Sequence, residues 1–587
     1  MRLLSSITTK GISYSRHRAL WHVKSKTFST RAIDDNNLHD ANVQQSPFPS
    51  IQTNNSTPIT EFVTAGWTKS NGKLKNKVAI IDGYTGQSRT FKQYHNDMGT
   101  IAANLKEDFG ISHDSTVALF APNTVDYVPI CLATALCGAK LTPINPQYKV
   151  NELVPILNKS ETTVLITHWS TVDVALEAMK DAKTVKHVVT IPEDEGLPVP
   201  EGTISLSSLK EHSNPLHDTN PSVFEDPANH PFLLPYSSGT TGLPKGVCLS
   251  HTNLVANLQQ LEIIDSISFP PNHKLISPLP FFHIYGYLVS ALYTAWQGQE
   301  IITMSGRFDL ELFCQLVEKY QPQRAHLVPP ILIGLAKHPV VDNYDLSSML
   351  TIVSAAAPLA KETENAVIER VGCEIKQGWG MSELSPIGLF SSDYNIKSGS
   401  VGQLVPNTYG KVVDPETKKA LGPGEPGELM IKGPQVMLGY LNEQEKTREC
   451  LDDDGWLRTG DISHYDEDGF FFITDRIKEL IKVRGFQVAP AELEALLLTH
   501  PSIDDVAVIP VEDEMSGELP RAYVSVRKDE LSQKLTEDEV KEWVKEKVAP
   551  HKRLAGGVEF IDQIPKSASG KILRRILREK YKEEVLQ

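Results

Sequence analysis

The sequence has few cysteines, and their spacing does not build a metal site or a disulfide scaffold. The 587 residues contain six cysteines, and no two of them form a C-x-x-C pair. We therefore expect a reducing compartment and no structural zinc site. The chain also lacks an uninterrupted apolar run of about 18 residues, so we expect no membrane span.

A surplus of basic residues is lacking as well. The chain has 58 Lys and Arg against 73 Asp and Glu, which gives a formal net charge of −15. Proteins that bind nucleic acid generally gather positive charge for the phosphate backbone. We therefore expect no nucleic-acid partner, although an anion site can lie within an acidic protein. A monomer and a homodimer both remain open.

Residues 1–33 differ in composition from the rest of the chain. They contain several Lys and Arg, many Ser and Thr, and no acidic residue. This composition is typical of an organelle transit peptide, and we expect mitochondrial import. A plastid leader, or a disordered tail on a cytoplasmic protein, remains the alternative. Residues 34–58 are rich in Asn, Asp, Ser, Gln and Pro, which predicts a linker.

Short apolar runs alternate with helical patterns in the next part of the chain. Strands are predicted at Val117–Phe120, Val164–Thr167 and Val188–Ile191. Helices are predicted between them, at Val125–Cys137 and Val172–Lys180. Such alternation indicates βαβ units and parallel sheets, and hence an α/β fold.

Two domains follow from the length and the patterns. We expect a large domain over residues 59–475, with parallel-sheet subdomains and a β-rich part near Pro426–Gly433. A small, mobile α+β domain is expected over residues 476–587. Its clearest helix begins at Thr536, which forms a capping box with Glu539. Its other predicted elements are a helix at Ala491–Leu498 and strands at Val506–Pro510 and Ala522–Arg527.

The segment Tyr236–Gly246 combines glycines, hydroxyl side chains and a lysine. Glycines allow backbone N–H groups to converge on phosphate oxygens, and Lys245 supplies a positive charge. The spacing is not that of a Walker A loop. Composition alone leaves a flexible polar loop as an equal alternative. The predicted phosphate-binding residues are Ser237, Ser238, Gly239, Thr240, Thr241 and Lys245.

This loop resembles the signature of the acyl-adenylate-forming superfamily, which contains acyl- and aryl-CoA synthetases, peptide-synthetase adenylation domains and beetle luciferases. Further segments resemble the family's other motifs and occur in the same order. The sequence at Gly485–Glu494 is most similar to that of 4-coumarate–CoA ligase-like enzymes. These segments are Phe281–Gly286, Gln377–Glu383, Trp456–Asp461, Thr474–Phe486 and Pro565–Lys571.

The resemblance implies roles in a first, adenylating half-reaction. Lys571 is the implied catalytic lysine, and Glu383 and Thr241 are the implied Mg²⁺ ligands. Trp379 and Ser382 stand where Tyr and Thr are usual, and both replacements keep a π face and a hydroxyl. The other residues implied to bind ATP or AMP are Gln377, Gly378, Asp461, Arg476 and Lys478.

A second half-reaction with CoA is implied by the same resemblance. Asp475 matches the hinge between the domains. Lys482 matches a catalytic position of the second step, and CoA is implied to contact Arg484, Gly485 and Gln487. His283 matches the histidine that gates the acyl pocket. The expected pocket lining consists of Tyr285, Val289, Val353 and Ala356.

The acid itself is less well defined. The pocket helix carries no Asp to hold an α-amine, so we do not expect an amino acid. A hydroxycinnamate-like acid and a medium-chain fatty acid are both compatible with the pattern. A luciferase-like enzyme, or an acyl-adenylate-binding protein without turnover, are the alternatives. The joint presence of Lys245, Glu383, Asp461, Arg476 and Lys571 argues against the last.

Overall fold

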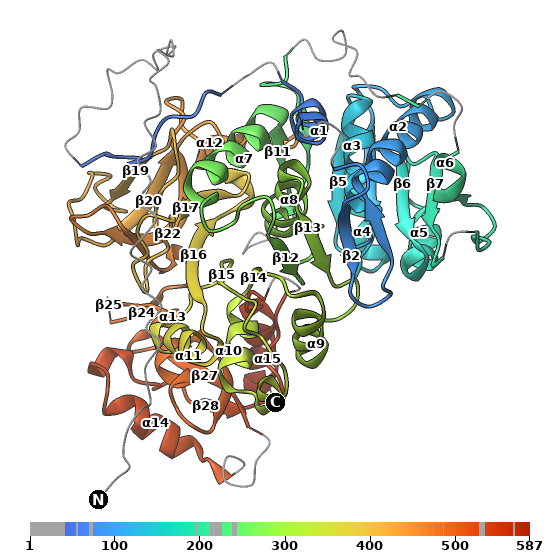
Figure 1. Cartoon of the computed structure of the whole chain (residues 1–587). Coiled ribbons are helices and arrows are strands. Elements are labelled where there is room, and N and C mark those ends of the chain that lie inside the picture. The colour runs from blue at the N-terminus through green and yellow to red at the C-terminus, as the bar shows by residue number, and fades with distance from the viewer. Residues whose placement is uncertain are drawn as a thin grey trace, which may run out of the picture. The chain divides into compact units, whose positions relative to one another are not determined.

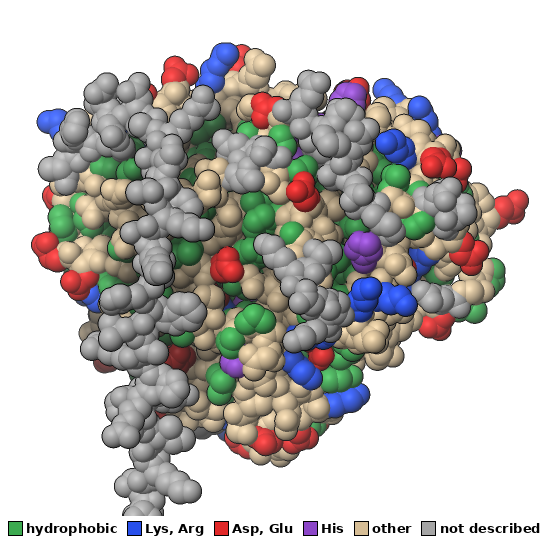
Figure 2. Space-filling model, turned by 45° about the horizontal axis from the view of Figure 1, so that its top comes forward, with side chains coloured by type: hydrophobic (Ala, Val, Ile, Leu, Met, Phe, Trp, Pro, Cys, Tyr) green, Lys and Arg blue, Asp and Glu red, His purple; other side chains and the backbone are tan. Residues whose placement is uncertain are grey.

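The computed structural model describes residues 42–53, 57–69, 74–194, 196–211, 215–216, 226–237, 244–484, 486–527, 534–567 and 570–586. Residues 40–587 form one compact unit, and the predicted transit peptide lies outside the described residues. None of the described helices combines the length and the apolar character that crossing a membrane requires. On the face shown in Figure 2, basic and acidic side chains are interspersed rather than separated by sign.

One mixed sheet contains the parallel strands that the sequence predicts. All five residues of β4 (Thr116–Phe120) are buried, as expected for a parallel strand covered on both faces. Ala118 and Phe120 pack with helices α4 and α5, whereas Val117 and Leu119 join the main core with α2 and α3 (Figure 1). On one side of β4 lie, from the edge inward, β10 (Tyr236–Ser237), β11 (Lys245–Ser250), β9 (Pro231–Leu233) and β5 (Lys140–Ile144). On its other side lie β6 (Thr162–His168), β7 (His187–Ile191) and β8 (Ile204–Ser205). A further strand, β21 (Gly439–Tyr440), pairs with β11.

A second sheet positions most of the site residues. Its strands from β16 to β2 are parallel, so their carboxyl ends lie at one edge, where ligands of α/β sheets usually bind. The spatial order is β18 (Gln403–Leu404), β17 (Ile387–Phe390), β16 (Glu374–Gly380), β15 (Thr351–Ser354), β14 (Arg324–Leu327), β12 (Lys274–Ser277), β13 (Glu300–Thr303), β2 (Val78–Asp82) and β3 (Ser88–Thr90).

Helices connect and cover these two sheets. Several begin with a side-chain cap, for example α7, where Ser250 and Asn253 form a reciprocal capping box. The α-helices before the C-terminal unit are α1 (Ile59–Lys69), α2 (Phe91–Glu107), α3 (Tyr127–Leu136), α4 (Val150–Lys159), α5 (Val172–Ala178), α6 (Leu206–Leu209), α7 (His251–Asp265), α8 (Tyr293–Gln297), α9 (Leu310–Tyr320), α10 (Pro329–Lys337), α11 (Lys361–Val371) and α12 (Gln444–Cys450).

The β-rich part is an antiparallel sheet whose edge strand comes from the predicted linker. Residues 44–45 form β1 (Gln44–Gln45), which pairs with β19 (Tyr409–Val413). Asn407 then exchanges two hydrogen bonds with the backbone of Ile51, at 3.0 and 2.8 Å. We call residues 42–53 the N-terminal strap. The remaining strands are β20 (Gly427–Lys432), β22 (Leu457–Tyr465) and β23 (Phe471–Arg476).

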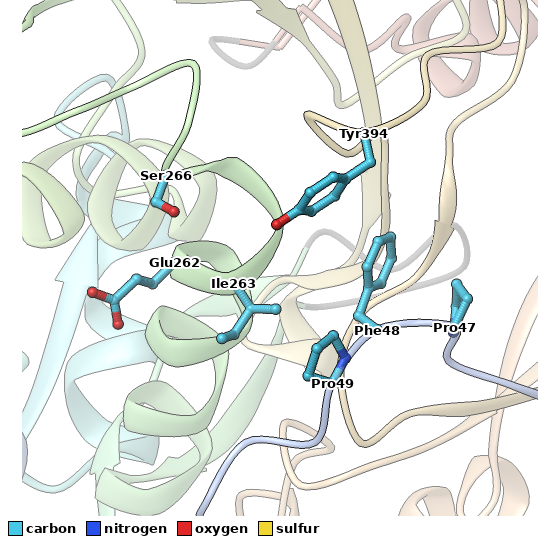
Figure 3. A pocket seen from close by; sticks show the side chains of 7 residues that line it. All are labelled: Pro47, Phe48, Pro49, Glu262, Ile263, Ser266 and Tyr394. Carbon is cyan, nitrogen blue, oxygen red and sulfur yellow. The ribbon is translucent and has the colours of Figure 1, made fainter. Parts of the chain in front are cut away.

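The strap also borders a surface hollow. Pro47, Phe48 and Pro49 face the end of α7 and the ring of Tyr394 across it (Figure 3). The residues that line this hollow do not include any of the predicted site residues. The linker prediction did not anticipate these contacts, because they join positions that are far apart in the sequence.

The C-terminal unit has its own core beneath a mixed sheet. Thr536 caps α14 (Glu537–Lys545) through the predicted capping box with Glu539. Val540 and Val544 of this helix are fully buried among the strands and α13 (Pro490–Leu498). The other elements are β24 (Ile481–Val483), β25 (Phe486–Val488), β26 (Ile503–Asp513), β27 (Gly517–Val526), β28 (Val558–Phe560) and α15 (Arg574–Leu586). An α/β large domain followed by this α+β unit confirms the predicted fold class.

Candidate active site

The turn before α15 brings Lys571 to a group of charged side chains from the β-rich sheet and from the 3₁₀ helix that follows β16. Burial and, to a smaller extent, the Arg476 guanidinium lower the pKa of Lys571 from 10.5 to about 8, although Asp461 and Glu383 act in the opposite direction. The half-buried ammonium is therefore within electrostatic reach of three residues that the sequence assigned to the nucleotide. This grouping is the central observation of the site.

The conformation of that turn depends on Gly570. Its φ is +78°, a left-handed conformation that favours glycine, and an added Cβ would lie 3.2 Å from Val328. Ser567 and Lys571 close the turn, with the Ser567 amide donating to the Lys571 carbonyl at 2.8 Å and the Lys571 amide donating to Ser567 Oγ at 3.1 Å. These two hydrogen bonds hold the backbone of Lys571, the predicted catalytic lysine.

Trp379, Asp461 and Arg476 form the candidate ribose site. The Trp379 indole N–H donates to Asp461 Oδ2 at 2.8 Å, and Arg476 Nε lies 3.4 Å from Asp461 Oδ1. Burial raises the pKa of Asp461. Among the described residues, Oδ1 accepts no hydrogen bond. A buried carboxylate oxygen in this state suits the hydroxyl groups of a ribose.

Glu383 is the candidate magnesium ligand. It lies in the short 3₁₀ helix Ser382–Leu384 directly after β16, and it is buried. Tyr440 Oη donates to Glu383 Oε1 at 2.8 Å. Hydrogen bonds within the described part of the chain leave Oε2 for a ligand, and carboxylate oxygens are what Mg²⁺ prefers. The residue type and its position therefore fit the implied metal.

The phosphate loop is described only at its ends. Ser238, Gly239, Thr240 and Thr241 lie outside the described residues, and for Ser237 the structure gives the backbone, in β10. Lys245 begins β11, and its Nζ lies 4.6 Å from the centre of the Tyr440 ring.

The other predicted nucleotide residues have different surroundings. The Gln377 amide donates to buried Glu364 at 2.7 Å, so this side chain is engaged with α11. Gly378 leaves room for Phe390, since a Cβ at 378 would lie 2.8 Å from that ring. Ser382 opens the 3₁₀ helix, and Lys478 lies in the 3₁₀ turn that follows β23.

The acyl-pocket residues gather around a π-helix, Tyr285–Leu292, a rare conformation that often marks functional sites. Tyr285 Oη donates to the Val353 carbonyl at 3.3 Å, and Val289 on the same helix is buried. Ala356, after β15, has a φ of +74°, a strained value for a residue with a Cβ. The structure thus brings three of the predicted pocket residues, Tyr285, Val353 and Ala356, to the carboxyl end of β15.

His283 directly precedes this helix. Burial, with a smaller contribution from the nearby Lys571 ammonium, lowers the pKa of His283 to about 3. Its Nδ1 accepts the Tyr285 backbone N–H at 3.3 Å. The imidazole is therefore neutral at working pH, and it shares an environment with Lys571.

A buried charge cluster supports the far side of the pocket helix. Arg324, Asp265, Lys376 and Asp393 are paired there, with Lys376 Nζ 2.8 Å from Asp265. Burial by itself raises the pKa of Asp265, but the two cations outweigh it and hold the pKa below its usual value. Arg324 also donates to His326 Nε2 at 3.0 Å, and this ring stacks on Tyr285.

The predicted hinge residue and the predicted CoA hairpin flank the 3₁₀ turn Ile477–Glu479. Asp475 accepts the Ala491 amide at 2.9 Å, which satisfies an N–H group at the start of α13. Lys482 and Gln487 are exposed and paired across β24 and β25, and Arg484 forms the hairpin tip. Gly485 lies outside the described residues. No hydrogen bond or ion pair of the described residues joins this hairpin to Lys571.

Family models match both parts of the chain. The model for AMP-binding enzymes covers residues 67–441, and the model for the C-terminal domain of AMP-binding enzymes covers residues 492–571. The chain belongs to the AMP-binding enzyme family. Glu383 and His283 fall within the first match and Lys571 within the second, while Asp461 and Arg476 lie between the two matches.

Relatives within this AMP-binding family cover most of the chain. A probable 4-coumarate–CoA ligase 1 from Dictyostelium discoideum is 39% identical over 86% of this chain and 92% of its own length. 4-coumarate–CoA ligase 2 from Petroselinum crispum is 41% identical over the same shares. ATP-bound MatB from Rhodopseudomonas palustris has a TM-score of 0.77 at 27% identity, covering 90% of this chain and 99% of its own.

Three residues of the site were not identified from the sequence. Tyr440 contacts Glu383 and Lys245, Glu364 fixes Gln377, and His326 supports Tyr285. None lies in a motif that suggests chemistry. For Tyr440, the sequence shows a Gly-Tyr pair, and the structure places this pair in a short strand next to β11.

Proposed function

We propose that this AMP-binding enzyme is an ATP-dependent acid–thiol ligase. It adenylates a carboxylic acid and then transfers the acyl group to CoA, releasing AMP and pyrophosphate. The observation that carries the proposal is the approach of Lys571 to Asp461, Arg476, Glu383 and His283. A carboxylate is a poor electrophile, and this cluster offers the charges that its activation requires.

In the first half-reaction a carboxylate oxygen of the acid attacks the α-phosphorus of ATP, and pyrophosphate leaves. Asp461 and Trp379 hold the ribose and adenine side of the nucleotide. Mg²⁺ on Glu383 would neutralise charge on the phosphates. The Lys571 ammonium stabilises the charge that builds between the carboxylate and the α-phosphate. Removing one preorganised donor of this kind costs about 10²–10³ in rate.

In the second half-reaction the CoA thiolate attacks the acyl carbon, and AMP leaves with the bonding electron pair. The small domain turns about Asp475, which withdraws Lys571. The hairpin with Lys482, Arg484 and Gln487 then reaches the acyl-adenylate. Its basic residues suit an acceptor that carries phosphates.

The acid is best described as hydroxycinnamate-like. The Tyr285 hydroxyl is bound to the Val353 carbonyl, and its aromatic ring can pack against the ring of an acid. The relatives at 39–41% identity carry the name 4-coumarate–CoA ligase. A medium-chain fatty acid is the second candidate, because Val289 and Val353 give an apolar lining.

A carboxylic-acid panel in a CoA-dependent AMP-release assay tests the function. We expect turnover with at least one ring-bearing or medium-chain acid. Lys571→Ala should abolish ATP–pyrophosphate exchange and spare thioester formation from supplied acyl-AMP. Lys566→Ala is the matched control, since Lys566 lies in the same loop but pairs with Asp505 at 2.6 Å. Exchange that survives in Lys571→Ala contradicts the mechanism.

We also propose mitochondrial import, supported by the basic, acid-free composition of residues 1–33. The chain fused to a fluorescent protein should reach mitochondria, and deletion of residues 2–33 should leave it in the cytosol. Delivery to plastids, or no change on deletion, contradicts this proposal.

A further inference from the structure

Tyr440 is held in place by its backbone. Its strand β21 pairs with β11 directly after the phosphate loop, with Val247 opposite Tyr440. The Tyr440 amide donates to Thr447 Oγ1 at 2.9 Å, and the next amide, of Leu441, donates to the Gly246 carbonyl at 2.8 Å. The backbone from which the ring projects is therefore held next to β11, the strand that follows the phosphate loop.

The hydroxyl group of Tyr440 fixes Glu383. It donates to Oε1 at 2.8 Å, and the Met437 amide donates to the Glu383 carbonyl at 2.9 Å. The side chain and the backbone of the candidate metal ligand are thus both tied to residues 437–440. A carboxylate held in this way keeps one orientation and offers its other oxygen to a cation.

The face of the same ring holds Lys245. The ammonium lies 4.6 Å from the ring centre, within the range of a cation–π contact. Tyr440 therefore contacts two groups of opposite charge, both of which the phosphates of ATP require. The aromatic face attracts the lysine without neutralising it.

Lys245 and Glu383 do not pair with each other. No ion pair joins them among those of the described residues, although both contact one side chain. A direct ion pair would occupy the carboxylate and the ammonium, and ATP would have to break it in order to bind. Each group instead contacts a different part of Tyr440, the ammonium its ring face and the carboxylate its hydroxyl, and each charge stays available.

We propose that Tyr440 is a positioning residue of the adenylation step, which orients Glu383 for the magnesium that accompanies ATP and keeps Lys245 apart from it. The proposal rests on the proposed function and deepens it. Tyr440 does not touch the reacting atoms, so it acts through Glu383 and Lys245. Its effect belongs to the binding of Mg²⁺ and nucleotide and not to the transfer to CoA.

Two variants separate the hydroxyl from the ring. Tyr440→Phe removes the bond to Glu383 and keeps the cation–π contact, while Tyr440→Leu removes both. Tyr394→Phe is the matched control, because Tyr394 is an exposed tyrosine outside the site. Titration calorimetry of ATP at a series of Mg²⁺ concentrations measures binding without turnover.

We expect Tyr440→Phe to raise the half-saturating Mg²⁺ concentration about 10-fold, as for loss of a hydrogen bond to a charged group, with Mg²⁺-free ATP affinity within twofold of wild type. Tyr440→Leu should weaken Mg²⁺-free ATP binding as well. Thioester formation from supplied acyl-AMP should stay within twofold in both variants.

An unchanged Mg²⁺ dependence in Tyr440→Phe overturns the inference, and so does equal loss in both half-reactions. Tyr440→Phe alone decides the outcome if the leucine variant does not fold. The proposed function has a separate test, because it fails when the wild-type enzyme adenylates no acid in the panel.

Discussion

The pH dependence of adenylation should report the ionisation of Lys571. Burial and Arg476 lower the pKa of Lys571 to about 8, and the reaction needs the ammonium form. Because the pKa is lowered, the charge is present below pH 8 and is lost as the pH rises through that value. The pH profile of kcat/KM for the adenylation step reports the ionisation of groups in the free enzyme. It should therefore show a descending limb near pH 8.

The size of the effect follows from that pKa. About nine in ten Lys571 side chains are charged at pH 7 and about one in ten at pH 9, so kcat/KM should fall about 10-fold between them. His283 adds no limb in this range, because its pKa lies near 3. ATP–pyrophosphate exchange at low ATP and fixed free Mg²⁺, measured from pH 6 to pH 10, gives the profile.

Two variants make the reasoning refutable. Lys571→Arg keeps a charge at every pH in the range, so its lower rate should show no fall near pH 8. Arg476→Ala removes the cation that lowers the pKa of Lys571, so the limb should move to higher pH whatever the loss of rate. A limb near pH 8 that persists in Lys571→Arg, or moves to lower pH in Arg476→Ala, refutes the assignment.

Three further changes probe other parts of the site. Asp461→Asn should weaken AMP binding about 10-fold in titration calorimetry, because a charged acceptor for the ribose is lost; unchanged affinity contradicts the ribose role. Arg324→Met should lower the free energy of unfolding by about 3–5 kcal/mol in denaturant melts, because the buried Asp265 carboxylate loses a partner; a wild-type melt contradicts it. Tyr285→Ala should raise the octanoate to 4-coumarate ratio of kcat/KM about 10-fold or more, whereas Tyr285→Phe should leave it within twofold; equal ratios in both variants would show that the ring does not limit the pocket.

Local patterns predicted much of the fold. The apolar run at Val117–Phe120 became β4, and the capping box at Thr536 became the start of α14. These features depend on residues close in sequence, where periodicity and hydrogen bonding act directly. The pairing of residues 44–45 with β19 could not be predicted in this way, because nothing in a polar segment specifies a partner more than 350 residues away.

The same distinction applies to the site. The sequence identified Trp379, Asp461 and Lys571 from motifs, and the structure brings them together. It gave no indication that Gln377 would bind Glu364, since the helix that carries Glu364 has no motif of its own. Residues that position others, such as Tyr440, carry no chemistry in the sequence and become visible through their contacts.

Under the proposed mitochondrial import, the N-terminal strap limits where a leader peptidase can cut. A cut before Asn42 leaves β1 and the Asn407 contacts with Ile51 intact. A cut beyond Gln45 would remove the strand that covers β19 and expose its N–H and C=O groups. Open strand edges of this kind pair with other chains and promote aggregation. Under the proposed import, the position of the mature N-terminus is therefore constrained from inside the fold, by the need to keep β19 covered.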